Sequence, residues 1–163
     1  MQRPSFSIFS PTTKDEIDQV RSLFVRYAAG LGVKLCFQNF DTELATLPAS
    51  YVAPKGALLA VRSAAGDAIG CCALRPLDTG DYPNAAEMKR LFVLPEHRGH
   101  GLGRLLVEAV LDAARQAAYD CVLLDTLTEM ETARALYVDL GFSEIPPYYH
   151  NPIAGAHYLR VTL

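Results

Sequence analysis

Apolar positions recur along this chain at two different periods, and the change of period predicts where helices and strands lie. Spacings of three and four residues follow Thr13 and again follow Gly101, which indicates two amphipathic helices that each turn one face toward a core. Short apolar runs bounded by turn residues are typical of strands. Such runs occupy residues 6–9, 57–62, 68–76, 85–93, 121–126 and 157–163.

The ends of the predicted helices carry residues that favour caps. Thr13 and Glu16 stand three positions apart in a capping-box pattern, and Gly30 and Gly32 supply the residue that commonly follows a helix. Two shorter helices are also expected. The predicted helices begin at Thr13, Asp41, Leu102 and Glu131, and the last ends at Leu140 before Gly141.

The order of these elements predicts the sheet. Three strands between residues 57 and 93 are joined by short links, which favours an antiparallel meander. Strand 85–93, a helix and strand 121–126 form a right-handed parallel crossover. The run 121–126 is nearly all apolar, as in a strand that is covered on both faces. The expected fold class is α+β in three α/β/α layers, with a mixed central sheet, an antiparallel N-terminal meander and a parallel central pair, in one domain over residues 1–163.

Composition excludes several classes of protein. The 163 residues are 50% hydrophobic and 20% charged, which is ordinary for a globular protein and unlike a disordered one. The formal charge of −3 comes without the basic patch that a nucleic-acid-binding protein needs. No apolar run is long enough to span a membrane, and the first residues lack the apolar core of a signal peptide. We therefore expect a cytoplasmic protein with neither nucleic acid nor membrane as a partner.

Cysteine and histidine spacing gives no support for a metal. The four cysteines form no Cys-x-x-Cys pair, so we expect reduced and mostly buried thiols. Adjacent Cys71 and Cys72 should point to opposite faces of their strand. His97 and His100 flank a glycine-rich loop without a cysteine or carboxylate at ligand spacing, and we expect them to be solvated.

The stretch Arg98-Gly-His-Gly-Leu-Gly103 lies between a strand and a helix and has the character of an anion site. Glycine lets a ligand approach the main chain closely, and the first turn of a helix offers unpaired N–H groups that favour a phosphate. A nucleoside-triphosphate loop is excluded because no Lys-Ser/Thr follows, and the dinucleotide pattern is absent. A glycine-rich turn without a ligand stays open at this point.

Two blocks of sequence resemble the GNAT superfamily of N-acetyltransferases. Arg98-x-x-Gly101-x-Gly103, after a strand that ends Leu91-Phe-Val93-x-Pro95, is similar to the acetyl-CoA loop of that family. Ala133-Arg-Ala-Leu-Tyr137-Val-Asp-Leu-Gly141-Phe142 is similar to the end of its last helix. The resemblance covers about residues 57–163 and implies the GNAT-like acyl-CoA N-acyltransferase fold, in which the two central parallel strands splay apart around the pantetheine arm. It also implies acetyl-CoA as co-substrate, without a metal.

The resemblance implies where acetyl-CoA binds. Its pantetheine would pair with the strand edge, its pyrophosphate would lie on main-chain N–H groups of the loop, and an N–H near Leu91 would stabilise the thioester oxygen. The implied cofactor-binding residues are Leu91, Phe92, Val93, Arg98, Gly99, His100, Gly101, Leu102, Gly103 and Arg104.

The resemblance further suggests two catalytic residues. Glu87 stands where some family members carry a general base, although it could instead pair with Lys89 or Arg75. Tyr137 is the candidate general acid for the CoA thiolate, with a purely structural core tyrosine as the alternative. Many members have an asparagine seven positions before this tyrosine, where this chain has Met130, so that cofactor contact should be absent or replaced.

The sequence gives the least information about the acceptor substrate and its pocket. Candidates for its pocket are Phe37, Gln38, Phe40 and Asp41, which join the first two helices, together with Arg75 and Tyr149. We interpret the chain as an acetyl-CoA-dependent N-acetyltransferase that acts on a primary amine of a small molecule or peptide by direct attack. The alternative is a non-catalytic acyl-CoA-binding sensor or interaction module. Monomer and homodimer are both open.

Overall fold

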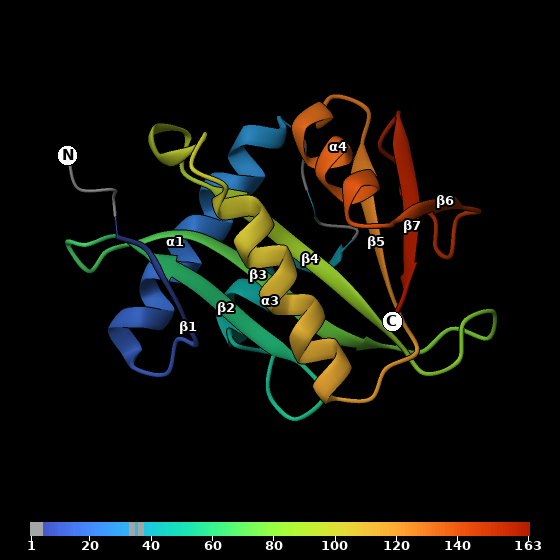
Figure 1. Cartoon of the computed structure of the whole chain (residues 1–163), viewed down its shortest axis with the longest axis horizontal. Helices are drawn as coiled ribbons and strands as arrows, with labels where there is room; N and C mark the ends of the chain where they lie inside the picture. Colours follow the sequence, from blue (N-terminus) through green and yellow to red (C-terminus); the bar gives the residue numbers. More distant parts are fainter. Residues whose placement is uncertain (1–4, 33–34, 36–37) are drawn as a thin grey trace.

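The fold is described by a computed structural model, which covers residues 5–32, 35 and 38–163. Seven strands form one sheet in the order β1-β2-β3-β4-β5-β7-β6 (Figure 1). Only the pair β4 and β5 is parallel. The strands are β1 (Ser7–Phe9), β2 (Ala57–Arg62), β3 (Ala68–Leu77), β4 (Ala85–Val93), β5 (Cys121–Leu127), β6 (Ser143–Ile145) and β7 (Ala156–Thr162).

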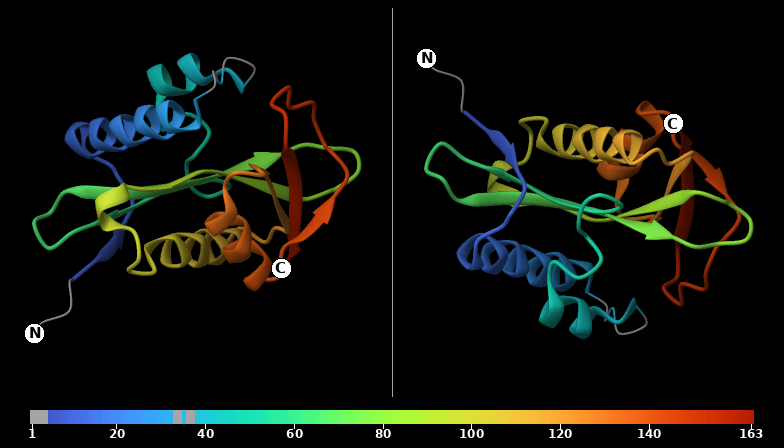
Figure 2. Two further views of the ribbon diagram at one scale, coloured as in Figure 1. Left: turned by 90° about the horizontal axis from the view of Figure 1, so that it is seen from above. Right: turned by 90° about the horizontal axis from the view of Figure 1, so that it is seen from below.

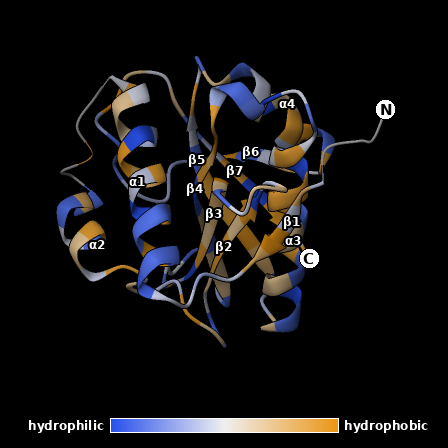
Figure 3. Ribbon diagram, turned by 90° about the vertical axis from the view of Figure 1, so that its left-hand side faces the viewer, coloured by the Kyte–Doolittle hydropathy of each residue, from blue (hydrophilic) through white to orange (hydrophobic). Residues whose placement is uncertain are grey.

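Helices cover both faces of the sheet, which confirms the predicted three layers (Figure 2). One core forms between the sheet and the first two helices, and a second forms beneath the other two. The strands between them are mostly apolar (Figure 3). The helices are α1 (Lys14–Leu31), α2 (Phe40–Thr46), α3 (Leu102–Gln116) and α4 (Glu131–Asp139), with a 3₁₀ turn, η2 (Pro95–His97), after β4. No described helix combines the length and the apolar character that a membrane span requires.

The predicted caps are present. The hydroxyl of Thr13 accepts a hydrogen bond from the Glu16 N–H at 3.2 Å, and the Glu16 carboxylate accepts one from the Thr13 N–H at 3.1 Å. Gly32, with φ of 67°, ends α1 in the left-handed conformation that glycine adopts at low cost. Local sequence therefore determines where α1 begins and ends.

The two central strands pair over only part of their length. The parallel ladder joins Ala85–Glu87 of β4 to Cys121–Leu123 of β5, whereas β4 continues to Val93 and β5 to Leu127. β5 is meanwhile paired along its whole length with β7. Beyond Glu87 and Leu123 the sheet therefore opens between β4 and β5, as the family resemblance implied.

Several elements differ slightly from the sequence prediction. β3 and β5 each extend one residue further, to Leu77 and Leu127, and α4 ends at Asp139. β1 begins at Ser7, α2 begins at Phe40, and β7 spans Ala156–Thr162. β6 was not predicted. β6 has only three residues, of which two are exposed, so it carries no apolar alternation that could indicate a strand. Its pairing with β7 provides the order that the local sequence lacks.

Candidate active site

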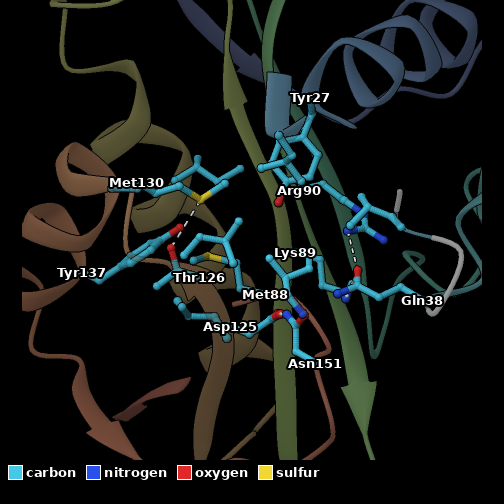
Figure 4. Close-up of a pocket in the computed structure, with 17 residues that line it drawn as sticks. Tyr27, Gln38, Met88, Lys89, Arg90, Asp125, Thr126, Met130, Tyr137 and Asn151 are labelled. Atoms are coloured by element: carbon cyan, nitrogen blue, oxygen red, sulfur yellow. Dashed lines mark hydrogen bonds between the residues drawn. The ribbon is translucent and has the colours of Figure 1, made fainter. Parts of the chain in front are cut away.

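A cleft lies where β4 and β5 separate, and its two halves differ in character (Figure 4). Its walls come from α1, β4, β5, α4 and the loop before β7. Toward α4 the lining is largely apolar and includes Met88, Leu91, Leu124, Met130 and Tyr137. Toward α1 the lining is polar and charged and includes Gln38, Lys89, Arg90, Asp125 and Asn151.

A bulge in β4 puts two consecutive cations on the polar side. The register with β3 shifts between Cys71 and Ala73, and Arg90 has a left-handed φ of 62°. Successive strand residues ordinarily point to opposite faces, but a bulge breaks that alternation. Both Lys89 and Arg90 consequently donate hydrogen bonds to Gln38 Oε1, at 3.1 and 2.7 Å.

Arg90 and Lys89 differ in their contacts with carboxylates. The Arg90 guanidinium contacts both carboxylate oxygens of Glu43, with 2.8 Å between Nε and Oε2 and 3.1 Å between Nη2 and Oε1. Such bidentate pairs are strong and geometrically specific. Lys89 has no comparable carboxylate contact, since its Nζ stands 3.9 Å from Glu87 Oε1. Burial lowers the pKa of Lys89 below its ordinary value, although the charge of Glu87 opposes this change.

A second polar cluster is centred on Asp125 of β5. Oδ2 of Asp125 accepts hydrogen bonds from the Tyr149 hydroxyl at 2.5 Å and from Asn151 Nδ2 at 2.8 Å. The Tyr149 hydroxyl also accepts a hydrogen bond from Gln38 Nε2 at 2.8 Å. Gln38 therefore connects the Lys89 side of the cleft to the Asp125 side.

Tyr137 lies on the apolar side of the cleft. It is only 6% exposed, and its ring packs against Phe142 with 5.5 Å between centroids. No described residue forms a hydrogen bond with its hydroxyl, which Figure 4 shows directed toward Thr126 and Met130. Burial raises the pKa of Tyr137 well above its ordinary value, so the hydroxyl keeps its proton through neutral pH.

Met130 stands at the N-cap of α4, where the family often has an asparagine, and it changes the local contacts. It makes no side-chain cap, and its sulfur accepts a hydrogen bond from the Thr126 hydroxyl at 3.5 Å. A thioether in this place offers no amide donor.

Glu87 is engaged by other residues, which is the alternative that the sequence left open. Its side chain is 1% exposed, and Oε1 lies 2.7 Å from Arg75 Nη2. Oε2 accepts a hydrogen bond from the Tyr148 hydroxyl at 2.6 Å. Burial alone would raise the pKa of Glu87, but the charges of Lys89 and Arg75 hold the pKa below its ordinary value. Glu87 and Arg75 both lie outside the lining of the cleft.

The glycine-rich loop, residues 98–103, leads into α3, and no side chain caps the N–H groups of the first turn of that helix. Gly99 and Gly101 have φ of 89° and 75°, and Gly101 occupies the N-cap of α3 without a capping side chain. Arg98 Nε donates a hydrogen bond to the Val93 carbonyl at 2.9 Å, which fixes the loop on the end of β4. Arg104 pairs with Asp139 and Glu108, so its charge is partly compensated. An uncapped helix N-terminus of this kind suits an anionic group.

The other predicted acceptor residues are dispersed. Gln38 lines the cleft, Phe40 is buried in the core beneath α2, Asp41 is exposed, and Phe37 lies outside the described residues. Tyr149 contacts the cleft through its bonds to Gln38 and Asp125.

Sequence reasoning missed Lys89, Asp125 and Asn151 as residues of the cleft. One signal was available, because Asp125 is the only charged residue in the otherwise largely apolar run 121–126. Across the part of the chain that the structure describes, no three His, Cys, Asp or Glu side chains gather in a way that could hold a metal ion.

Similar proteins agree on one family. The model of the acetyltransferase (GNAT) family matches residues 20–142. An uncharacterized N-acetyltransferase of Schizosaccharomyces pombe is 38% identical over 100% of this chain and 99% of its own length. An uncharacterized N-acetyltransferase of Dictyostelium discoideum is 28% identical over 85% of this chain and 90% of its own length.

Solved structures agree on the fold. A GNAT-family acetyltransferase of Staphylococcus aureus has a TM-score of 0.79 at 16% identity and covers 97% of this chain and 99% of its own. An N-acetyltransferase of Thermoplasma acidophilum in complex with coenzyme A has a TM-score of 0.70 at 14% identity and covers 98% and 99%. With a matching family model over most of its length and a relative that aligns from end to end, this chain belongs to the GNAT family of acetyltransferases and is an acyltransferase.

Proposed function

We propose that this enzyme transfers the acetyl group of acetyl-CoA to a primary amine of a small molecule or peptide by direct attack within the cleft. The observation that carries the proposal is the cleft itself. It opens between the separated strands β4 and β5, with an uncapped glycine-rich helix N-terminus beyond the end of β4 and a polar chamber on its α1 side. One site can therefore hold an anionic cofactor and a polar acceptor.

Acetyl-CoA would be held by main-chain groups more than by side chains. The edge of β4 at Leu91–Val93 has no β5 partner and can pair with an extended amide chain. The first turn of α3, after Gly101, can accept the pyrophosphate. A Cβ at Gly99 or Gly101 would meet nothing within 4 Å, so the space beside both residues is open to a ligand. When bound, acetyl-CoA supplies an activated acetyl thioester.

Tyr137 is the proton donor in this proposal. Its hydroxyl faces the cleft, has no partner among the described residues, and keeps its proton because burial raises its pKa. A hydroxyl of this kind can protonate the sulfur of the departing thiolate. Glu87 is proposed to stabilise the wall of the site, since Arg75 and Tyr148 occupy both of its carboxylate oxygens.

The test combines binding with turnover. Calorimetry with acetyl-CoA should give one site per chain, and release of free thiol should accelerate when a suitable amine from a panel of amino acids, polyamines and peptides is added. Tyr137→Phe should bind acetyl-CoA as the parent does and turn over more slowly. Absence of acetyl-CoA binding, or binding without thiol release on any amine of the panel, would contradict the proposal.

A further inference from the structure

Lys89 and Asp125 stand opposite each other across the opening of the sheet. Each lies two residues beyond the last paired couple, Glu87 of β4 and Leu123 of β5. Strand residues two apart share a face, so both side chains point to the side of α1, where Tyr148 contacts Glu87. Figure 4 shows both directed into the cleft.

The two opposite charges form no direct ion pair among the described residues. Among the ion pairs of the described residues, Arg75 pairs with Glu87 and Arg90 pairs with Glu43, but none joins Lys89 to Asp125 within 4.0 Å. Opposite charges in a buried site are costly unless they find partners. A gap therefore separates a cation from an anion inside the cleft.

Lys89 keeps capacity for a ligand. Its side chain is 4% exposed, and among the described residues its Nζ donates one hydrogen bond, to Gln38 Oε1 at 3.1 Å. An ammonium group has three donors, and Glu87 Oε1 at 3.9 Å is beyond hydrogen-bond distance. At least one donor is left to bind an anionic group in the cleft.

On the opposite side of the cleft, Asp125 can still accept a hydrogen bond from a ligand. Both of its hydrogen bonds, from Tyr149 and Asn151, reach Oδ2, and no other described residue donates to Oδ1. Gln38 fixes the spacing of the two charged groups, because its Oε1 accepts from Lys89 and its Nε2 donates to Tyr149. The network thus presents one free carboxylate oxygen and one free ammonium donor toward the same space.

The wall on this side also contains apolar side chains. Leu31, Leu35 and Ile153 line the same cleft, and the Tyr27 ring packs edge-on against Phe92 at 6.3 Å between centroids. A ligand that fits here carries one cationic group, one anionic group and an apolar body.

We propose that the acceptor is an amino acid with an apolar side chain, whose amino group binds Asp125 Oδ1 and whose carboxylate binds Lys89 Nζ. This inference rests on the proposed function and names its substrate class. The bound ammonium group first loses one proton to Asp125 Oδ1, which releases it to solvent, and becomes a nucleophilic amine. The C–N bond then forms as the thioester C–S bond breaks, the second nitrogen proton passes to Asp125 Oδ1, and Tyr137 protonates the sulfur and regains a proton from solvent. Asp125 is then a catalytic residue and Lys89 a specificity-determining one.

Three acceptors that differ only at the carboxylate position test this inference. Thiol release would be measured with acetyl-CoA and L-phenylalanine, L-phenylalaninamide or 2-phenylethylamine. A charge-assisted hydrogen bond is worth about 1.5–3 kcal/mol, so phenylalanine should be preferred by about 10- to 100-fold in kcat/KM. Lys89→Met should abolish that preference, mainly through KM for phenylalanine.

Further variants separate recognition from folding. Lys14→Met removes a lysine that is 92% exposed on α1 and should change nothing. Asp125→Asn should slow all three acceptors, because the variant has no carboxylate to accept the amine proton. Acetyl-CoA affinity, measured by calorimetry, should be unchanged in every variant. Turnover that is equal for the three amines, or that Lys89→Met leaves unaltered, would overturn the inference and leave acetyl transfer intact, whereas loss of acetyl-CoA binding in the parent would overturn the proposed function.

Discussion

Glu87 is a buried carboxylate whose ionised state depends on its neighbours. Two cations and a tyrosine hydroxyl compensate the charge, and Lys89, itself 4% exposed, depends on Glu87 in turn. Removing one member of a buried pair costs about 3–5 kcal/mol because the other charge is left uncompensated. We expect Glu87→Gln to lower the free energy of unfolding in urea by this order. Glu108→Gln, at a position 51% exposed, should change it by less than about 0.5 kcal/mol.

The same carboxylate predicts a pH dependence of stability. The pKa of Glu87 is lower in the folded protein than the ordinary value of 4.5, so the unfolded chain binds its proton more readily. The stabilisation from Glu87 is therefore complete above pH 4.5 and is lost as the pH falls from 4.5 through the lower, folded pKa. Urea midpoints of the parent and of Glu87→Gln should converge over that interval. A constant difference down to the acid limit would contradict this assignment.

Tyr137 gives a prediction about rate and pH together. As a general acid it should contribute about 10²-fold or more to kcat, and Tyr137→Phe should lose that factor while it keeps the affinity for acetyl-CoA. Because burial raises its pKa well above 10, Tyr137 should introduce no alkaline fall in kcat between pH 7 and 10. Pre-steady-state thiol release at several pH values measures both effects. An unchanged kcat in the phenylalanine variant would leave Tyr137 with a packing role.

At the scale of elements, the start of α3 requires a left-handed backbone conformation at Gly101 and is also the proposed site for the pyrophosphate of acetyl-CoA. Gly101 adopts φ of 75° at the N-cap, and a side chain in that conformation costs about 1–2 kcal/mol. Gly101→Ala should therefore destabilise the fold by this amount and weaken acetyl-CoA binding. Gly30→Ala, inside α1 with open space around it, should instead stabilise the fold by about 0.5–1 kcal/mol. Thermal unfolding and calorimetry distinguish the two, and equal effects of the two substitutions would refute a special role for Gly101.

Local signals predicted the elements better than the site. The caps of α1 at Thr13 and Gly32 and the start of α3 at Leu102 depend on a few adjacent residues, so the sequence could indicate them. Adjacent Cys71 and Cys72 also pack into separate cores, as strand alternation predicts. The bulge at Arg90 could not be predicted from nearby residues. A left-handed φ is usually signalled by glycine, but here it occurs at an arginine, and the bulge accompanies a shift of register with β3.

Contacts between residues far apart in the chain could not be predicted from the sequence. Tyr148 reaches Glu87 over 61 positions, and Gln38 reaches Tyr149 over 111. These bonds depend on the path of the loop before β7, which no periodicity describes. The sequence therefore suggested Glu87 as a base, while the partners that occupy its carboxylate and the position of Asp125 in the cleft became visible only in the fold.

At the scale of the whole molecule, the cleft coincides with an interruption of the central sheet. β4 is paired with β3 along most of its length, but toward β5 only three residues are paired. Amides at an edge without a partner exchange faster than those within a ladder. The proposed binding mode would complete this edge and the first turn of α3 with hydrogen bonds from one ligand.

Hydrogen exchange therefore locates the ligand without any assay of activity. Acetyl-CoA should slow exchange in peptides that cover Met88–Val93 and Gly99–Arg104, whereas peptides from β2, which contributes no residue to the lining of the cleft, should change little. A purely global stabilisation would protect all slowly exchanging peptides to a similar degree, because every one would report the same unfolding equilibrium. Gly101→Ala should reduce the protection of the loop peptide more than that of β4, since Gly101 lies at the proposed pyrophosphate site. Protection that appears equally in β2 would remove the support for binding between the separated strands.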